Sequence, residues 1–379
     1  MIRSMELARE ACDTFLPGLR DALADVPLEV LESAESPGLD AFRRAGGPGL
    51  LVPTAYSGGG AGPLEAVRAT RAIGALSPSL AVAATMHNFS VASLVALLGS
   101  ADATGLEWLL IEGIARDRLL VASGFAEGRA GQGILSATMT ARQVKAGYLV
   151  TGAKKPCSLS RSMDLLTASV AVPLPDGGTE LGVALIPATS PGITRHPFWA
   201  SGFLAGAESD EVRLVDVEVA PELMLKPKQE LGGGLDTLQT VGFVWFELLV
   251  TAAYTGAVAR LVERALDEGR GSTTDRAALA TKLEAAIAVV ENQARAAESG
   301  EVGHDELAAV LTARYAAQDL LVEAADRAAE LLGGMAYIGS SEVGYLLAVS
   351  RALAFHPPSR SSSAQALLDH HAGQPLLLS

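Results

Sequence analysis

Cysteine is scarce in this chain. Its 379 residues include only two cysteines, Cys12 and Cys157. Two thiols are too few for a disulfide framework or for a metal site built from thiolates. The six histidines are scattered and show no paired metal-ligand spacing. The sequence therefore predicts neither a metal site nor a disulfide-stabilised scaffold.

Positive charge is also in short supply. The chain carries 29 Lys and Arg against 43 Asp and Glu, a formal net charge of -14. Such a charge repels phosphate backbones, so no nucleic-acid partner is expected. No uninterrupted apolar run reaches the roughly 18 to 20 residues of a membrane helix, and residues 1–20 lack the order of a signal peptide. We therefore expect a cytoplasmic protein without a membrane partner, which binds a protein or a small ligand.

The chain divides into three blocks of different periodicity. Residues up to about 118 carry helical patterns, which return after the glycine run at 232–234. Between them, turn signals separate four β-type runs: Val144–Thr151, Leu165–Val172, Leu181–Ile186 and Glu211–Val219. Such segregation favours an α+β fold over a doubly wound sheet. We expect an N-terminal helical domain at 1–118, a middle β-barrel-like domain at 119–226 and a C-terminal four-helix-type domain at 227–379.

Six short motifs are spread along these blocks. They are Gly49–Gly60, Ser123–Gly133, Gly152–Ser158, Gly182–Pro187, Val215–Val219 and Glu330–Tyr337. Each motif alone is weak, but in this order they resemble the acyl-CoA dehydrogenase family over nearly the whole chain. The resemblance implies the fold of that family, with a helical front, a β-rich middle and a helical bundle at the back.

The resemblance also implies a flavin. Oxidation of a saturated acyl thioester requires a base for the α-proton and a hydride acceptor, and no side chain accepts hydride. In this family the acceptor is FAD. The positions that the resemblance places against FAD are Phe125, Ala126, Gly131, Gln132 and Ser158. It places Gly333 and Gly334 near the cofactor of a neighbouring subunit, so a homodimer or homotetramer is implied.

Several positions depart from the family pattern around the flavin. A loop hydroxyl is replaced by Ala126, a serine by Gln132, and an aromatic that packs against the flavin by Pro156. The arginine signature that clamps a neighbour's pyrophosphate is reduced to Gly269–Ser272. Within it, Arg270 is either the surviving arginine or a solvated arginine at a helix end. Flavin contact is therefore expected to be weaker than in the family.

The largest departure is at the catalytic glutamate. An ungapped count aligns the family's Tyr-Glu-Gly-Thr with residues 359–362, so that Arg360 replaces the base. Ser362 then takes the last position of the motif, which contacts the cofactor. A guanidinium is permanently charged and cannot abstract a proton at neutral pH. His356, just before this motif, is a second candidate base because its ordinary pKa lies near neutrality, although such a histidine more often only packs under the loop.

Some family members place the base on the first helix of the back domain. In this chain Glu247 lies there, within the largely apolar run 241–253. An acid among apolar neighbours has a raised pKa, as a general base requires. The ungapped count puts Phe246 at the alternative base position and Glu247 where the family has an arginine. We therefore expect that an acid and an arginine have exchanged places, with Glu247 facing Arg360 either as a base or as a structural ion pair.

Three functions are open on these observations. The leading hypothesis is an FAD-dependent dehydrogenase of an acyl-CoA or acyl-carrier-protein thioester in a biosynthetic pathway, with Glu247 as base and a flavoprotein or oxygen as electron acceptor. The second is a flavin-dependent monooxygenase of the same fold, which the loss of the glutamate favours. The third is a non-catalytic homologue. Between the first two, dehydrogenation is favoured because Ser158, Gly131 and the double glycine survive, although fold analogy alone does not prove a reaction.

Overall fold

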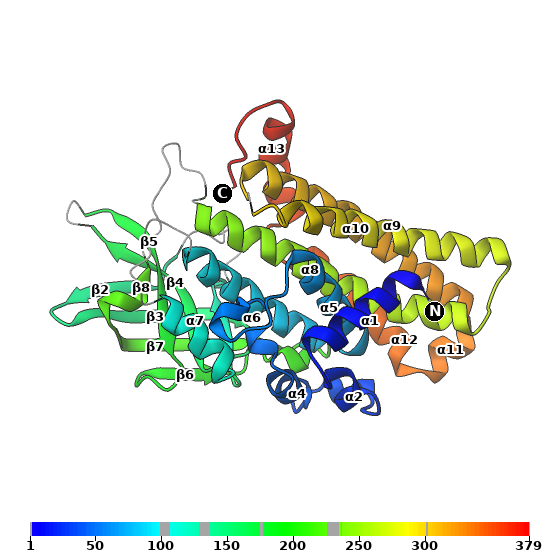
Figure 1. The fold of residues 1–379 in the computed structure, drawn as a ribbon, viewed down its shortest axis with the longest axis horizontal. Coiled ribbons are helices and arrows are strands. Elements are labelled where there is room, and N and C mark those ends of the chain that lie inside the picture. The colour runs from blue at the N-terminus through cyan, green and yellow to red at the C-terminus, as the bar shows by residue number, and fades with distance from the viewer. Residues whose placement is uncertain are drawn as a thin grey trace.

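The computed structural model describes residues 2–98, 107–128, 137–174, 177–225, 235, 237–300 and 302–378. The front and back helices pack against one another, and a β-sheet lies at one end of them, on the left of Figure 1. The N-terminus lies among the helices, far from the strands (Figure 1). The α+β fold class expected from the sequence is confirmed, with a helical front, a β middle and a helical back.

The front part consists of helices. They are α1 (Arg3–Phe15), α2 (Leu19–Leu23), α3 (Leu28–Leu31), α4 (Gly38–Arg44), the 3-10 turns η1 (Gly47–Gly49) and η2 (Thr54–Tyr56), α5 (Pro63–Leu76), α6 (Pro78–Leu98) and α7 (Glu107–Arg116). Helices α5 and α6 both begin at a proline. The first helical position suits proline, because its missing N–H would have no partner there. These prolines therefore fix where the two helices start.

An eight-stranded sheet forms the middle part. Its elements are β1 (Val121–Gly124), β2 (Thr140–Val144), β3 (Gly147–Cys157), β4 (Leu165–Pro173), β5 (Thr179–Pro187), β6 (Ile193–His196), η3 (Ala205–Ala207), β7 (Asp210–Val219), η4 (Pro221–Leu223) and β8 (Met224–Leu225). The strand order is β6-β7-β3-β2-β4-β5-β8, and β1 also pairs with β4. Three predicted runs fall on β4, β5 and β7. The run Val144–Thr151 is wrong as one strand, because the chain turns back after Val144 and pairs β3 antiparallel to β2.

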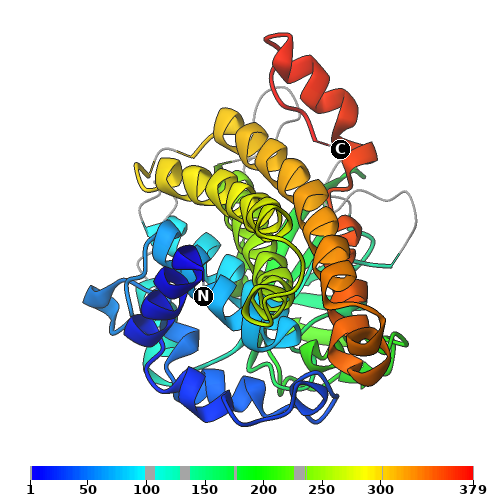
Figure 2. The same cartoon turned by 90° about the vertical axis from the view of Figure 1, so that its right-hand side faces the viewer.

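The back part is again helical. Its elements are α8 (Thr237–Asp267), α9 (Thr273–Ala297), α10 (His304–Leu332), α11 (Gly334–Gly339), α12 (Ser341–Ser350), η5 (Ala352–Phe355) and α13 (Arg360–His371). The start of α9 is encoded locally, because the hydroxyl of Ser272 accepts from the Asp275 N–H and the Asp275 carboxylate accepts from the Ser272 N–H. Helices α8, α9 and α10 run side by side (Figures 1 and 2).

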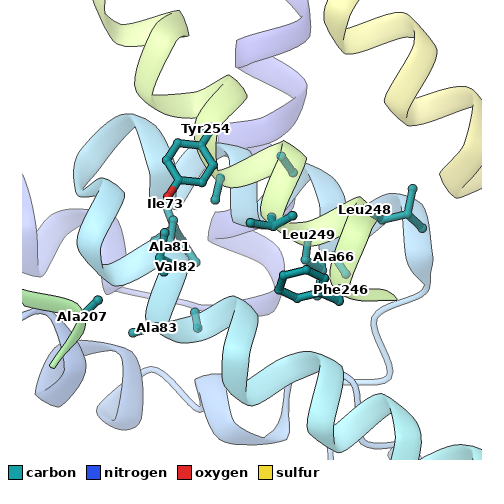
Figure 3. Close-up of a cluster of buried hydrophobic side chains, with 14 of the residues drawn as sticks. Ala66, Ile73, Ala81, Val82, Ala83, Ala207, Phe246, Leu248, Leu249 and Tyr254 are labelled. Atoms are coloured by element: carbon teal, nitrogen blue, oxygen red, sulfur yellow. The ribbon is translucent and has the colours of Figure 1, made fainter. Parts of the chain in front are cut away.

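Two core helices resemble membrane helices in length and composition. They are Pro78–Leu98, which is α6, and Gln239–Asp267 within α8. Their most apolar stretches are 67% and 83% buried inside the protein, which is the environment of core helices. Figure 3 shows how apolar side chains such as Ile73, Val82 and Leu249 from α5, α6 and α8 gather in one cluster.

Helices α5 and α8 approach each other at backbone distance. A Cβ atom on Gly74 would lie 2.1 Å from the carbonyl oxygen of Ala253, and one on Gly256 would lie 2.0 Å from the carbonyl oxygen of Arg71. Core packing leaves no space to absorb such overlaps. The two glycines therefore set the position of α8 relative to the front of the protein.

The Gly74→Ala and Gly256→Ala variants are each expected to lower the free energy of unfolding by about 1 to 3 kcal/mol, because the added methyl group overpacks the contact. Urea unfolding followed by circular dichroism measures this change. Gly113→Ala on α7 is the matched control, since nothing lies within 4 Å of its added methyl group. That variant should instead gain roughly 0.5 to 1 kcal/mol from helix propensity. Equal stability of all three variants would contradict the close contact.

Candidate active site

A cavity of about 210 Å³ lies where the sheet meets α6 and α8. Its lining is mostly apolar and includes Val82, Met86, Phe89, Leu94, Leu97, Phe125, Ala126, Pro156, Leu181, Val183, Trp199, Leu204, Leu225, Gly242, Phe243 and Phe246. Among the described residues that line it, His356 is the one ionisable side chain. A ligand in this cavity therefore meets apolar groups, small polar groups and a single imidazole.

Aromatic rings form part of the cavity wall. Phe89 on α6 lies between Phe125, which follows β1, and Phe246 on α8, with ring centroids 6.3 Å and 5.4 Å away. Phe246 projects from the stretch of α8 that also carries Leu248 and Leu249 (Figure 3). Such rings provide large apolar surfaces that exclude water from a bound ligand.

Hydroxyl groups supply most of the polarity of the wall. The side chains of Ser93 and Thr167 each donate to a backbone carbonyl at 3.0 Å. The hydroxyls of Ser158 and Ser209 bond to each other at 2.9 Å. A hydroxyl whose proton is used in this way keeps oxygen lone pairs for a ligand. The wall therefore offers uncharged hydrogen-bond acceptors.

A buried ion pair anchors the strand that leads to Ser158. Lys154 Nζ on β3 is buried and donates to Glu127 Oε1 at 2.7 Å and to Ser169 Oγ at 2.8 Å. Burial raises the pKa of Glu127, but hydrogen bonds from Lys154 and Thr138 outweigh it and lower that pKa to about 2. Burial lowers the pKa of Lys154. These charges neutralise each other behind the cavity wall.

His356 brings a titratable nitrogen to the cavity. Its Nε2 atom lies 2.8 Å from Tyr254 Oη, and its ring centroid lies 6.0 Å from that of Phe246. Burial, followed by the positive charge of Arg314, lowers the pKa of His356 to about 3. The imidazole is therefore neutral at physiological pH. The structure places His356 in the cavity wall, and its role as a base stays a prediction.

Glu247 directly follows Phe246 but points elsewhere. Its Oε2 atom accepts from Arg314 Nη1 at 2.6 Å, and both side chains are buried. Burial raises the pKa of Glu247 to about 7, against the opposite effect of Arg314. The expectation that Glu247 faces Arg360 is wrong. Arg360, the first residue of α13, is exposed and pairs with Asp319 on α10 at 2.8 Å. Arg314 on α10 is the arginine that contacts Glu247.

The other predicted site residues divide into three groups. Phe125, Ala126 and Ser158 line the cavity, whereas Gly131 and Gln132 lie outside the described residues. The rest are away from the cavity lining: Arg270 is exposed and pairs with Glu268 at 3.5 Å, Gly333 and Gly334 join α10 to α11, and Ser362 lies in the first turn of α13. Their contact with a neighbouring subunit's cofactor stays a prediction.

Sequence reasoning missed Ser209, Tyr254 and Arg314. Ser209 meets Ser158 because β3 and β7 pair, a contact between strands distant in the chain. Tyr254 gave no local signal beyond its place on an apolar helix. For Arg314 a signal existed, because this arginine interrupts the small and apolar residues of a helix expected to pack inside the protein.

The residues of the cavity fit a flavin. Its isoalloxazine ring has apolar faces and a polar edge that carries N–H and carbonyl groups. The phenylalanine rings match the faces, and the Ser158 and Ser209 hydroxyls match the edge, since one of the pair can donate and the other can accept. The backbone beside Ala126 borders the same space.

A curated relative matches nearly the whole chain. Isobutylamine N-hydroxylase of Streptomyces viridifaciens is 51% identical over 376 residues, which are 99% of this chain and 100% of the relative. This similarity overturns the leading hypothesis of acyl-thioester dehydrogenation, and with it the role of Glu247 as the base that removes an α-proton. It supports the second hypothesis, a monooxygenase of the same fold.

Solved structures with the same fold cover almost all of the chain. KijD3 in complex with dTDP has a TM-score of 0.82 at 19% identity, over 98% of this chain and 97% of that chain. FMN-bound TdsC from Paenibacillus sp. A11-2 has a TM-score of 0.77 at 21% identity, over 97% and 98%. Methanesulfinate monooxygenase MsuC from Pseudomonas fluorescens has a TM-score of 0.78 at 19% identity, over 100% and 99%. At such identities the likeness shows the fold.

Two family models match segments on either side of the sheet. The acyl-CoA dehydrogenase N-terminal domain matches residues 6–105, and the acyl-CoA dehydrogenase C-terminal domain matches residues 242–356. Both matched segments contribute to the cavity wall, through α6 from the first and through α8 and His356 from the second. The chain therefore belongs to the acyl-CoA dehydrogenase family of flavin-dependent oxidoreductases.

Proposed function

We propose that this chain is a flavin-dependent monooxygenase that hydroxylates the nitrogen of a small aliphatic amine. The observation that carries the proposal is the 51% identity to isobutylamine N-hydroxylase over nearly the full length of both chains. The lining supports it independently, because the described residues of the lining suit an amine and include no carboxylate of the kind that α-proton removal requires.

The apolar, uncharged surroundings that the described lining provides favour an amine in its free-base form. A nitrogen atom attacks oxygen through its lone pair, which protonation would occupy. Burial penalises the charged form of a group, so an apolar site lowers the pKa of a bound amine. The described lining contains no carboxylate that would stabilise the ammonium ion. The cavity therefore selects the reactive form of the substrate.

The polar groups of the wall can orient such an amine. The N–H groups of the amine can donate to the hydroxyl oxygens of Ser93 and Thr167. These hydroxyls already donate their own protons to backbone carbonyls, so their lone pairs are available. The neutral imidazole of His356 is a further partner. A short alkyl group can pack against Phe89 and Phe246. Apolar contact at one end and hydrogen bonds at the other would fix the direction in which the nitrogen points.

When bound, reduced flavin supplies the electrons for transfer of one atom of molecular oxygen to the amine nitrogen, while the other atom leaves as water. The part of this chain is to hold the ring through Ser158, Ser209 and the backbone beside Ala126, and to exclude water from the cavity. The expectation that the flavin is FAD stays a prediction. The homo-oligomer and the cytoplasmic location also stay predictions.

Purified protein supplied with reduced flavin, oxygen and isobutylamine is expected to release N-isobutylhydroxylamine. Mass spectrometry should find one oxygen atom from ¹⁸O₂ in the product, and FAD and FMN are compared in parallel reactions. A reaction without amine measures background oxygen consumption. Oxygen consumption without any hydroxylamine across short aliphatic amines, or bleaching of bound flavin by acyl-CoA thioesters, would overturn the proposal.

The kcat/KM for isobutylamine is expected to rise by about tenfold per pH unit below the amine's pKa, because the free-base fraction rises in that way. The profile should show no inflection near pH 6.5. The pKa of His356 is lowered to about 3, so this side chain stays neutral over the assayed range of pH 5.5 to 9. Steady-state kinetics of the wild type and of the His356→Gln variant check this expectation. An inflection near pH 6.5 that disappears in the variant would show that His356 titrates there.

A further inference from the structure

Arg314 connects three parts of the protein behind the cavity wall. Its side chain is 1% exposed, and Nη1 donates to Glu247 Oε2 on α8 at 2.6 Å. Its Nη2 atom donates to the carbonyl oxygens of His356 at 2.6 Å and Leu353 at 3.0 Å. One buried side chain of α10 therefore links α8 to the backbone of the segment that carries His356.

The ring of His356 is held separately from its backbone. Tyr254 Oη on α8 lies 2.8 Å from His356 Nε2, and the Phe246 ring packs beside the imidazole. Helix α8 thus holds His356 in two ways. It holds the imidazole through Tyr254, and it holds the peptide backbone through Glu247 and Arg314.

The Glu247 and Arg314 pair is a costly way to stabilise a fold. Both charges lose their hydration, and Glu247 Oε1 has no hydrogen-bond partner among the described residues. Apolar side chains of similar volume often make a protein equally stable or more stable than a buried ion pair does. The pair lies directly behind the cavity wall, where a role in positioning accounts for its presence.

We propose that the Glu247–Arg314 pair positions His356 in the cavity wall. Arg314 acts as a positioning residue through the carbonyls of Leu353 and His356, and Glu247 orients the guanidinium. The inference rests on the proposed function, in which His356 faces the amine. Without the pair, the segment keeps the hydrogen bond from Tyr315 Oη to the Pro358 carbonyl at 3.0 Å. The segment would then stay attached, while His356 would lose its fixed place.

The charge of Arg314 has a second effect on the same imidazole. It adds to burial in disfavouring the protonated ring, so the pair helps to keep His356 neutral. Among the described residues, the titratable groups packed near this ring are Tyr254 and Glu247 from α8, and Arg314 and Tyr315 from α10. Burial raises the pKa of both tyrosines, so they are neutral at physiological pH, and the charge that lowers the pKa of His356 is that of Arg314.

The double variant E247L/R314M tests the proposal. It removes both charges together and fills similar volumes, so neither partner is left as an unpaired buried charge. The control is R71M/E291L, which removes a second buried Arg–Glu contact of 2.8 Å. Glu291 also pairs with Arg68 and Arg295, whose side chains are partly exposed and stay hydrated in the variant. The Arg71–Glu291 pair joins α5 to α9, does not line the cavity, and likewise includes an arginine that donates to a backbone carbonyl.

We expect E247L/R314M to fold and to lose about 10²-fold in kcat/KM for isobutylamine, mainly in kcat, because a small misplacement of an orienting group has effects of this size. More oxygen should be consumed per hydroxylamine formed. A second measurement uses ¹⁵N NMR of flavin-free protein at pH 5.5, in which the His356 imidazole signal is assigned by its absence from H356Q. In the wild type this signal should be that of a neutral ring, because the pKa of His356 is about 3. In E247L/R314M it should gain a protonated fraction. The control R71M/E291L should change neither measurement.

Two outcomes would overturn the positioning role: wild-type kcat/KM with an unchanged His356 signal in E247L/R314M, or equal losses in both double variants. If E247L/R314M does not fold, R314K serves in its place, because lysine keeps the charge but lacks the planar fork that bonds a carboxylate and two carbonyls together. Wild-type behaviour of R314K would then count against the role. A wild type that hydroxylates no amine, together with an altered His356 signal in E247L/R314M, would reject the proposed function and support the positioning.

Discussion

The close packing of helix α8 (Thr237–Asp267) against α5 is the constraint on which the site depends. Its backbone meets α5 so closely at Gly74 and Gly256 that neither position has room for a Cβ atom. Because α8 cannot shift, consecutive residues point in fixed directions about 100° apart. Phe246 lines the cavity, and Glu247 turns to Arg314 on α10. One rigid helix thus supplies both the apolar wall of the site and the charged pair behind it.

Two buried ion pairs lie close to the cavity, but their charged groups are not part of its described lining. On the sheet side Lys154 pairs with Glu127, and on the helix side Arg314 pairs with Glu247. Both pairs are buried, and among the described residues neither contributes to the lining. The described residues that a bound molecule would contact are therefore neutral, while the strand and loop that carry Ser158 and His356 are held by strong interactions. This arrangement combines a rigid wall with an apolar interior.

The same fold can serve two different reactions because their chemical needs differ at one point. Removal of an α-proton from a thioester requires a carboxylate at the reacting carbon. Oxygen transfer to an amine requires a nitrogen lone pair and no such carboxylate. In this chain the loop position carries Arg360 on the outer surface, and Glu247 is engaged by Arg314. What the fold retains is a mostly apolar cavity with hydroxyls that suit the edge of a flavin ring. Function within one fold is decided by such site residues.

Local sequence patterns were sufficient for much of the architecture. The β-type runs on β4, β5 and β7 and the long helices of the back part could be predicted, because residue period and capping groups act over a few residues. The turn between β2 and β3 was overlooked because it interrupts one continuous β-type run. The motif order placed Phe125, Ala126 and Ser158, which do line the cavity. These positions follow strands whose register is set by neighbouring residues.

The partners of the buried charged side chains could not be predicted from local sequence patterns. The acid at Glu247 stood out in an apolar helix, but its arginine lies 67 residues away on α10 rather than in the loop at Arg360. The contact between Ser158 and Ser209 likewise depends on the pairing of β3 with β7. The sequence by itself determined most of the elements and the family, because these depend on residue type and short spacing. Only the tertiary structure decided which charge neutralises which, because that depends on the distance between side chains that the chain brings together from remote positions.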